Sequence, residues 1–159
     1  MKYLLVGYGN PLRGDDGVGP VVAEGFLAEA EALMGPAAGE VKVVAVPQLL
    51  PELAELFAEA ERVVLVDASM GDPPGTVRVR RVEPSTATGE PVIHAYDPAT
   101  LAAWAGQLYG RTPVVQVIAV GTQSFAFGQG LTPDVAAVVP EVMRTAARLF
   151  LESPPAGGS

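Results

Sequence analysis

The length, composition and charge of the chain set the first limits on what it can be. Its 159 residues, of which 49% are hydrophobic and 18% charged, are enough for one folded domain with its own core. A formal net charge of −8 argues against a nucleic-acid-binding protein, because such a surface would repel phosphates. The absence of cysteine excludes disulfides, thiolate metal sites and cysteine nucleophiles.

The amino terminus and the apolar segments indicate where the protein works. The start MKYLLVGYGN holds a short apolar run that leads into a glycine turn, which is typical of a buried strand and too short for a signal peptide. No segment approaches the roughly 20 apolar residues that a membrane helix needs. We therefore expect a cytoplasmic protein without a membrane or nucleic-acid partner, and we take it to be a monomer.

Five apolar segments predict β-strands. They are short, rich in branched side chains and bounded by glycine, proline or charged residues, as expected for a mostly parallel sheet. In the fourth strand, alternation places Arg78 and Arg80 on one face, which we interpret as a solvated face. The predicted strands cover residues 2–6, 41–46, 62–66, 76–82 and 114–120.

Apolar residues at helical spacing predict four helices between and after these strands. The first spans residues 18–33 and ends before a glycine-proline pair, and the second spans residues 51–60. The third begins after Asp97, which is the expected N-cap, with Pro98 in the first helical position. The buried stripe of this helix is expected to consist of Leu101, Trp104 and Leu108.

The last helix repeats the cap-then-proline start of the third. Thr132 precedes Pro133, and apolar residues continue at helical spacing over residues 135–150. Pro140 lies inside this segment and is expected either to kink the helix or to mark its true beginning. The tail at residues 153–159, SPPAGGS, is predicted to be disordered.

The alternation of strands and helices predicts a single α/β domain over residues 1–152. It should have three layers, with a twisted, mostly parallel sheet between helices on both faces. In such sheets, ligands bind at the carboxyl ends of the strands, where the connections diverge. The chemistry of this protein is therefore expected in the loops that follow residues 6, 46, 66 and 120.

The loop after the first strand, GYGNPLRGDDGVG, is the most unusual segment of the chain. It fails the dinucleotide-binding fingerprint G-x-G-x-x-G, because Leu12 stands at the third glycine and two aspartates would repel a pyrophosphate. Asp15 and Asp16 could cap the first helix, one as the N-cap and the other against its positive end. The neighbouring glycines indicate, in addition, a backbone held close to another group.

Two further polar residues stand where a ligand would bind. Asp67 follows the apolar run VVLV at the expected carboxyl edge of the sheet. It either has a partner in the crevice or accepts hydrogen bonds from the backbone of residues 68–71. His94, the only histidine, precedes the third helix in a loop that could reach the same crevice, although a lone histidine is more often structural.

Asp16, Asp67 and His94 together make a candidate functional site. Two carboxylates and one imidazole can bind a divalent transition-metal ion and leave positions open for water or substrate. The same groups could instead act as general acid and base without a metal. A serine nucleophile is not supported, because neither Ser69 nor Ser124 lies in a G-x-S-x-G segment.

From residue 2 to about residue 150, the sequence resembles the maturation proteases of nickel-iron hydrogenases. The glycine loop resembles the amino-terminal signature of that family, with Asp16 at its acidic metal-contacting position. VVLVDA resembles the second motif, with Asp67 as the second carboxylate ligand, and His94 stands in the segment that holds the family's ligand histidine. Residues 128–132 resemble the start of the family's last helix.

Two segments resemble one branch of this family, which serves bidirectional, soluble-type hydrogenases. They are residues 47–53 and residues 94–110. The chain departs from the family pattern at Pro47, where the branch often has histidine, at Asp97, where serine is common, and at residues 122–123. None of these positions is a predicted ligand, so the departures bear on substrate specificity more than on chemistry.

The resemblance implies a hydrolase of the aspartyl protease type. This endopeptidase would remove the C-terminal extension of a nickel-iron hydrogenase large-subunit precursor after nickel has been inserted. Asp16 and Asp67 would be its catalytic residues. Asp16, Asp67 and His94 would contact the nickel that the precursor presents, so that the protease itself holds no tightly bound ion.

Two other functions stay open on the sequence alone. A protein of the same fold could bind metal or a nickel-loaded precursor as a checkpoint without cutting it. A small-ligand-binding α/β domain would use the aspartates as helix caps only. In that case, replacing Asp16 or Asp67 would cost about 0.5–2 kcal/mol of stability and nothing else.

Overall fold

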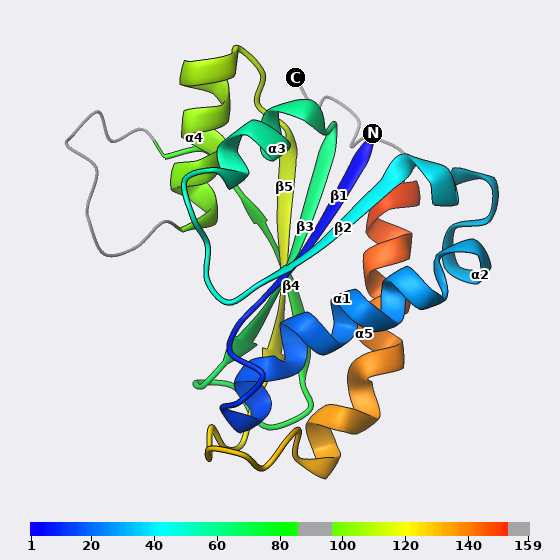
Figure 1. Cartoon of the computed structure of the whole chain (residues 1–159), viewed down its shortest axis with the longest axis vertical. Helices are drawn as coiled ribbons and strands as arrows, with labels where there is room; N and C mark the ends of the chain where they lie inside the picture. The colour runs from blue at the N-terminus through cyan, green and yellow to red at the C-terminus, as the bar shows by residue number, and fades with distance from the viewer. Residues whose placement is uncertain (86–96, 153–159) are drawn as a thin grey trace.

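The computed structural model describes residues 1–85 and 97–152 and shows a three-layer α/β domain. A five-stranded sheet with the strand order β2-β1-β3-β5-β4 lies between two groups of helices (Figure 1). The pairs β1–β2, β1–β3 and β3–β5 are parallel, and β4 pairs with β5 in the antiparallel direction. The predicted fold class, with a mostly parallel sheet covered on both faces, is therefore confirmed.

The strands lie where the apolar segments predict them. The three central strands are β1 (Tyr3–Tyr8), β3 (Arg62–Ser69) and β5 (Val114–Gly121), and they are apolar along most of their length because helices cover both faces. The edge strands are β2 (Val41–Val46) and β4 (Val77–Val82). Both β1 and β3 continue past their predicted ends, since pairing with their neighbours extends to the residues that follow the apolar runs.

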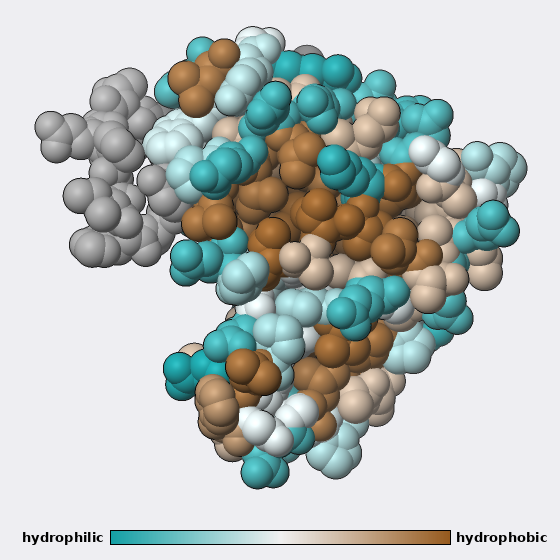
Figure 2. All heavy atoms as spheres, in the orientation of Figure 1, coloured by the Kyte–Doolittle hydropathy of each residue, from teal (hydrophilic) through white to brown (hydrophobic). Residues whose placement is uncertain are grey.

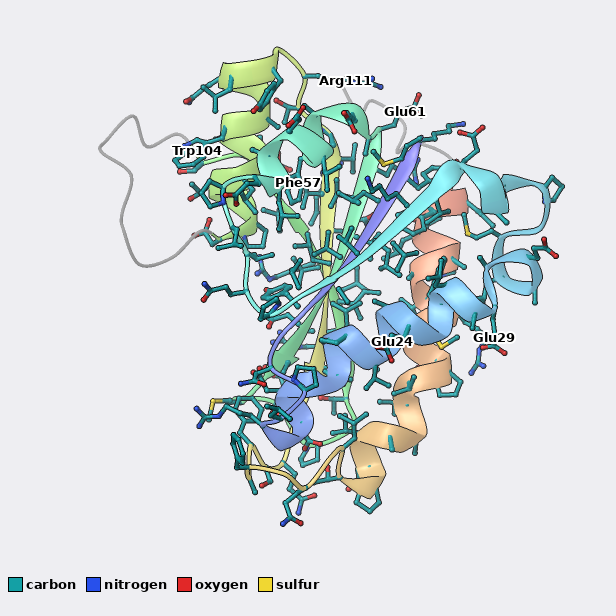
Figure 3. All side chains as sticks on the ribbon, viewed as in Figure 1. Glu24, Glu29, Phe57, Glu61, Trp104 and Arg111 are labelled. Carbon is teal, nitrogen blue, oxygen red and sulfur yellow. The ribbon has the colours of Figure 1, made fainter. Side chains whose placement is uncertain are left out.

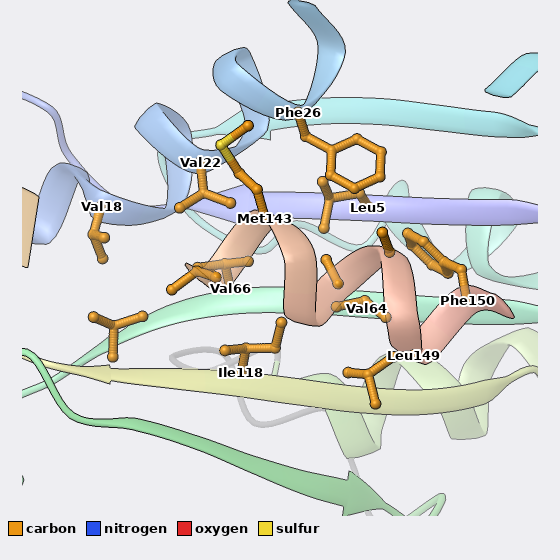
Figure 4. Packing of buried hydrophobic residues seen from close by; sticks show 14 of the residues in the cluster. Leu5, Val18, Val22, Phe26, Val64, Val66, Ile118, Met143, Leu149 and Phe150 are labelled. Carbon is orange, nitrogen blue, oxygen red and sulfur yellow. The ribbon is translucent and has the colours of Figure 1, made fainter. Parts of the chain in front are cut away.

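One face of the sheet is covered by α1 (Val18–Ala28), α2 (Ala30–Met34) and α5 (Pro133–Leu151). Figure 4 shows side chains of α1 and α5 meeting those of the central strands in a continuous apolar cluster. Phe150 lies near the rings of Tyr3 and Phe26, with centroid separations of 5.1 and 6.2 Å. The members labelled in Figure 4 are Leu5, Val18, Val22, Phe26, Val64, Val66, Ile118, Met143, Leu149 and Phe150.

The other face is covered by α3 (Leu53–Glu59) and α4 (Pro98–Tyr109), which also contact each other. Phe57 of α3 is fully buried there, and Trp104 of α4 packs against the same cluster (Figure 3). No helix in residues 1–85 and 97–152 has the length and apolar character that a membrane crossing requires.

The predicted first helix is broken. Residues 18–33 form α1 and α2, separated at Glu29, although the alanine and glutamate residues around the break favour a continuous helix. The break turns α2 toward α5, and Met34 is buried against the first cluster. Tertiary packing therefore overrides local helix propensity at this point. A 3-10 turn, Gly35–Glu40, then leads into β2.

The start of α4 is as predicted, but its buried stripe is not. Asp97 is the N-cap and accepts a hydrogen bond of 2.8 Å from the Thr100 amide. Leu101 is fully buried and Trp104 is half-buried, whereas Leu108 is 65% exposed. The prediction for Leu108 was wrong because small alanines bring the first turns of α4 close to the core, while its last turn lies outside the core.

The last helix begins at Pro133, as the cap-then-proline pattern predicts, and runs through Pro140 without interruption. Pro140 therefore does not mark the start of α5. Thr132 occupies the N-cap position, but its side chain makes no capping hydrogen bond to α5. The hydroxyl of Thr132 donates instead to the carboxylate of Asp15.

Two glycines allow α1 to rest directly on the backbone of the sheet. A methyl group on Gly7 of β1 would overlap the carbonyl oxygen of Gly19 in the first turn of α1. A methyl group on Gly19 would lie 2.7 Å from backbone atoms of Tyr8 and 2.8 Å from the carbonyl oxygen of Val66. This close contact fixes where the glycine loop leaves and rejoins the sheet.

The contact between β1 and α1 predicts that Gly7→Ala destabilises the protein by about 1–3 kcal/mol or more, because the added methyl group forces α1 away from the sheet. Gly39→Ala is the matched control, since no atom lies within 4 Å of the position of its added methyl group. It should leave the free energy of unfolding unchanged or raise it by up to about 1 kcal/mol. Urea titration measures both values, and equal effects of the two substitutions would contradict the described packing.

Candidate active site

The two predicted catalytic aspartates lie at the carboxyl edge of the parallel sheet. Asp67 belongs to β3, and Asp16 belongs to a 3-10 turn, Gly14–Gly17, between β1 and α1. Gly7 of β1 pairs with Val66 of β3, so Tyr8 and Asp67 follow on adjacent strands. The 3-10 turn that carries Asp16 contacts β3, and the negative charge of Asp16 contributes to a raised pKa of Asp67.

Asp67 lies in an environment that disfavours its charge. Partial burial is the main cause of a raised pKa, and the carboxylate of Asp16 adds to it. Hydrogen bonding from the Tyr8 hydroxyl and the positive charge of Arg80 act in the opposite direction, with a smaller contribution from the Ala68 amide. The net effect is a pKa for Asp67 above its usual value.

Tyr8 is the main side-chain partner of Asp67. Burial raises the pKa of the Tyr8 hydroxyl, and the charge of Asp67 raises it further, so this hydroxyl stays protonated and acts as a donor. Its ring packs against the cluster beneath α3 and α4. Both alternatives that the sequence left open for Asp67 therefore apply, because it accepts hydrogen bonds from the Tyr8 side chain and from the Ala68 backbone.

Asp16 is held by the loop in which it lies. Its Oδ2 accepts a hydrogen bond of 2.8 Å from the Asn10 amide, and the side chain of Asn10 accepts one of 3.0 Å from the Leu12 amide. Gly9 has a φ of 143°, and a side chain there would overlap the carbonyl oxygen of Asp16. The glycine at this position thus serves a close backbone contact, as the sequence indicated.

Asp15 points away from α1, toward the loop between β5 and α5. It is fully buried and accepts hydrogen bonds from the amides of Gln123, Ser124 and Thr132, and from the Thr132 hydroxyl. Burial alone would raise the pKa of Asp15, but these hydrogen bonds outweigh it and hold the pKa below its usual value.

The prediction that Asp15 or Asp16 is the N-cap of α1 is wrong, although both lie in the turn directly before this helix. The N-cap of α1 is Gly17, and no side chain makes a capping hydrogen bond there. The 3-10 turn that precedes α1 directs Asp15 to a distant loop, and Asp16 bonds back to Asn10. Asp15 therefore makes long-range bonds, and Asp16 a bond within its own loop, in place of the N-cap bond that the sequence pattern favours.

The third predicted ligand, His94, lies outside the described residues. Within residues 1–85 and 97–152, no group of three or more His, Cys, Asp and Glu side chains could hold a metal ion. Of the three predicted ligands, the structure describes only the two carboxylates, Asp16 and Asp67. The three-residue ligand set stays a prediction.

The arginines of β4 are exposed, as predicted, but they differ in what they contact. Arg78 forms an ion pair of 2.8 Å with Asp72, which also accepts from Ser69. Arg80 shares a face of β4 with Arg78 and carries its charge toward Asp67. The sequence identified this face but not its relation to Asp67, because the relation depends on the strand order.

A cavity of about 210 Å³ lies between the glycine loop and the end of β2. Figure 2 shows the surface hollowed on this side of the molecule, below an apolar region that covers the middle of the face. One exposed carboxylate, that of Glu24, belongs to the cavity wall. The remaining lining residues are apolar or glycine: Gly9, Pro11, Pro20, Ala45, Val46 and Pro47.

No protein-family model matches the chain, and no curated protein matches its sequence. Solved structures do match its fold. The [NiFe] hydrogenase maturation protease HycI from Thermococcus kodakarensis superposes with a TM-score of 0.69 and 20% identity, covering 95% of this chain and 93% of HycI. The hydrogenase maturating endopeptidase HybD from E. coli gives a TM-score of 0.65 and 23% identity, covering 91% of this chain and 89% of HybD.

A third match is the hydrogenase 2 maturation peptidase from a Thaumarchaeota archaeon. It has a TM-score of 0.67 and 20% identity, and the alignment covers 96% of this chain and all of that one. These structures span almost the whole chain and share its strand and helix architecture. The chain therefore has the fold of the hydrogenase maturation proteases.

The environment of Asp67 predicts a pH-dependent effect of Asp67→Asn on stability. Because the folded protein raises the pKa of Asp67, the charged form is less favourable in the folded than in the unfolded state. Asp67 therefore destabilises the protein increasingly as pH rises through its folded pKa. We expect Asp67→Asn to be more stable than the wild type near pH 7 and to lose this advantage in acid, where both forms are neutral.

Urea unfolding at about pH 7 and about pH 3 measures this difference. Glu141→Gln, which removes one charge from an exposed site on α5, should change the free energy of unfolding by no more than about 0.5 kcal/mol. A variant Asp67→Asn that is less stable than the wild type at pH 7 would show that Asp67 is a structural residue.

Proposed function

We propose that the protein is an endopeptidase that removes the C-terminal extension of a nickel-iron hydrogenase large-subunit precursor after nickel insertion. Asp16 and Asp67 would be its catalytic residues, and the nickel would belong to the substrate. The observation that carries the proposal is the convergence of these two aspartates, from different segments, at the carboxyl edge of a sheet with this fold.

The electrostatics of the pair support a role in chemistry. Two carboxylates that repel each other are costly for the fold, and a divalent cation bound between them would relieve the repulsion. The raised pKa of Asp67 also brings this carboxyl group nearer to the pH range in which a general acid or base exchanges protons. Residues that weaken a fold in this way are typical of active sites.

The neighbours of Asp67 would orient it during the reaction. The Tyr8 hydroxyl donates to one side of the carboxylate, and Arg80 contributes positive charge from β4. A precursor-borne nickel ion could then be contacted by Asp16 and Asp67, with His94 as a third ligand. The ion would place the scissile peptide near these carboxylates, where a water molecule can be activated.

The proposal extends to the kind of hydrogenase and to the compartment. The segment 47–53 resembles the branch that serves bidirectional, soluble-type hydrogenases, and its first residue lies in the wall of the cavity beside the glycine loop. This position supports a role of the segment in substrate choice. The protease would act in the cytoplasm.

The proposal predicts cleavage of a nickel-loaded precursor and no cleavage of the same precursor without nickel. Asp67→Asn and Asp16→Asn should each lower the rate at least about 100-fold, because each removes a negative charge from the reacting centre. Glu141→Gln, an exposed charge removal on α5, should cleave at the wild-type rate. Mass spectrometry of the precursor, before and after incubation, measures the loss of the extension.

The same assay distinguishes the checkpoint alternative. A protein that binds the nickel-loaded precursor but releases it uncut would disprove the peptidase function and favour a binding role. Cleavage that continues at the wild-type rate in both Asp67→Asn and Asp16→Asn would disprove the assigned site. Circular dichroism of each variant confirms that any loss of cleavage occurs in folded protein.

A further inference from the structure

Asp15 is a charged residue that lies at the sheet edge and is shielded from solvent between two loops. Its side chain is 0% exposed, and no other Asp, Glu, Lys or Arg is buried to this degree within residues 1–85 and 97–152. A buried charge is costly unless it is hydrogen-bonded, and the fold supplies Asp15 with donors for both carboxylate oxygens. A neutral side chain could not accept all of these bonds, so the carboxylate connects the segments that donate them.

We propose that Asp15 is a positioning residue, whose carboxylate joins the glycine loop to the β5–α5 loop and thereby holds Asp16 in the reacting geometry. This proposal rests on the function proposed above. It assigns Asp15 no contact with the substrate. Its effect on the reaction passes through the backbone that it shares with Asp16.

The hydrogen bonds around Asp15 show why a carboxylate is required. The Gln123 amide donates to Oδ2 at 2.8 Å and the Ser124 amide donates to the same oxygen at 3.2 Å. The Thr132 amide donates to Oδ1 at 2.6 Å, and the Thr132 hydroxyl reaches Oδ1 and Oδ2 at 3.0 and 2.8 Å. Every partner is a donor, and only a carboxylate accepts on both of its atoms.

Backbone contacts close the connection on both sides of Asp15. Its own amide donates to the Ser124 carbonyl at 2.9 Å, and the Gly128 amide donates to the Leu12 carbonyl at 2.8 Å. Gly14 has a φ of 54°, and a side chain there would come within 2.6 Å of the Ser124 carbonyl oxygen. The two loops therefore form one hydrogen-bonded unit.

Asp16 depends on this unit for its orientation. The carboxylate of Asp16 accepts from the Asn10 amide, a group of the same glycine loop. If the loop shifts, the Asp16 carboxylate shifts relative to Asp67, which lies on the rigid central strand β3. A displacement of about 1 Å in a reacting group can cost a factor of about 100 in rate.

The first test is Asp15→Asn, which keeps the size of the side chain but replaces one acceptor oxygen with a donor. The amide nitrogen would face amide donors of the β5–α5 loop, so part of the connection is lost. We expect kcat for the nickel-loaded precursor to fall about 10- to 100-fold, while KM changes less than about 3-fold. The loss of kcat should remain after each rate is divided by the concentration of folded enzyme.

A milder series on Thr132 covers the case in which Asp15→Asn does not fold. Thr132→Val replaces the hydroxyl with a methyl group and should lower kcat about 3- to 10-fold. Thr132→Ser keeps the hydroxyl and should have a kcat close to that of the wild type. Phe150→Leu is the matched control, because it weakens the core near Tyr3, at the opposite end of β1. It should lower stability and leave kcat unchanged.

A second measurement does not depend on enzymatic activity. The Asn10 amide donates to Asp16, so its hydrogen-exchange rate, measured by NMR, reports whether Asp16 stays in place. We expect faster exchange of this amide in Asp15→Asn and Thr132→Val, and wild-type exchange in Phe150→Leu. Unchanged exchange and unchanged kcat in both loop variants would overturn the proposal.

These readouts separate the two proposals. A wild-type protein that cuts no precursor, together with faster Asn10 exchange in the loop variants, would disprove the peptidase function but support the positioning of Asp16 by Asp15. A wild-type protein that cuts the precursor, with loop variants that retain wild-type kcat and exchange, would support the function and disprove the positioning.

Discussion

The buried carboxylate of Asp15 is the interaction on which the arrangement of the candidate site depends. It accepts hydrogen bonds from residues 108 to 117 positions later in the chain, and so brings the first and the last loops of the sheet edge together. The close contact of Gly7 with Gly19 fixes where α1 leaves the sheet, and Asp15 fixes the turn that precedes it. Asp16 lies between these two constraints.

The fold shifts the pKa values of Asp15 and Asp67, two aspartates of this sheet edge, in opposite directions. The hydrogen bonds to Asp15 hold its pKa below the usual value, so the charged form of Asp15 stabilises the folded state at neutral pH, and this contribution is lost as pH falls. Burial and the nearby Asp16 raise the pKa of Asp67, so its charge has the opposite effect. The hydrogen-bond partners thus distinguish a carboxylate whose charge the fold stabilises from one whose charge it disfavours, although the sequence places both in segments of the same sheet edge.

Much of the fold could be predicted from the sequence, because the spacing of apolar residues in each segment is typical of either a buried strand or an amphipathic helix. The same pattern located Asp67, since a charged residue after a buried strand must lie at the carboxyl edge of a parallel sheet. The break of the first helix at Glu29 and the exposure of Leu108 could not be predicted, because they depend on how helices pack against each other.

Local sequence patterns could not predict the hydrogen-bond partners of the aspartates, because these partners also depend on the tertiary structure. Capping rules describe bonds within a few residues, whereas Asp15 bonds to the loop before α5. Tyr8 and Arg80 come near Asp67 only through the strand order, in which β1 lies on one side of β3 and β4 lies beyond β5. A signal for Tyr8 did exist, since it lies one residue beyond the apolar run of β1, after Gly7, at the same edge as Asp67.

The central claim is that Asp16 and Asp67 form one site that can contact a metal ion together. Crystals soaked in Ni²⁺, or in Cd²⁺ as a substitute, would test it most directly by anomalous scattering. The account predicts one ion bound by both carboxylates, at about 2.0–2.3 Å from each ligand oxygen. No ion at this edge of the sheet, or an ion that contacts neither carboxylate, would contradict it.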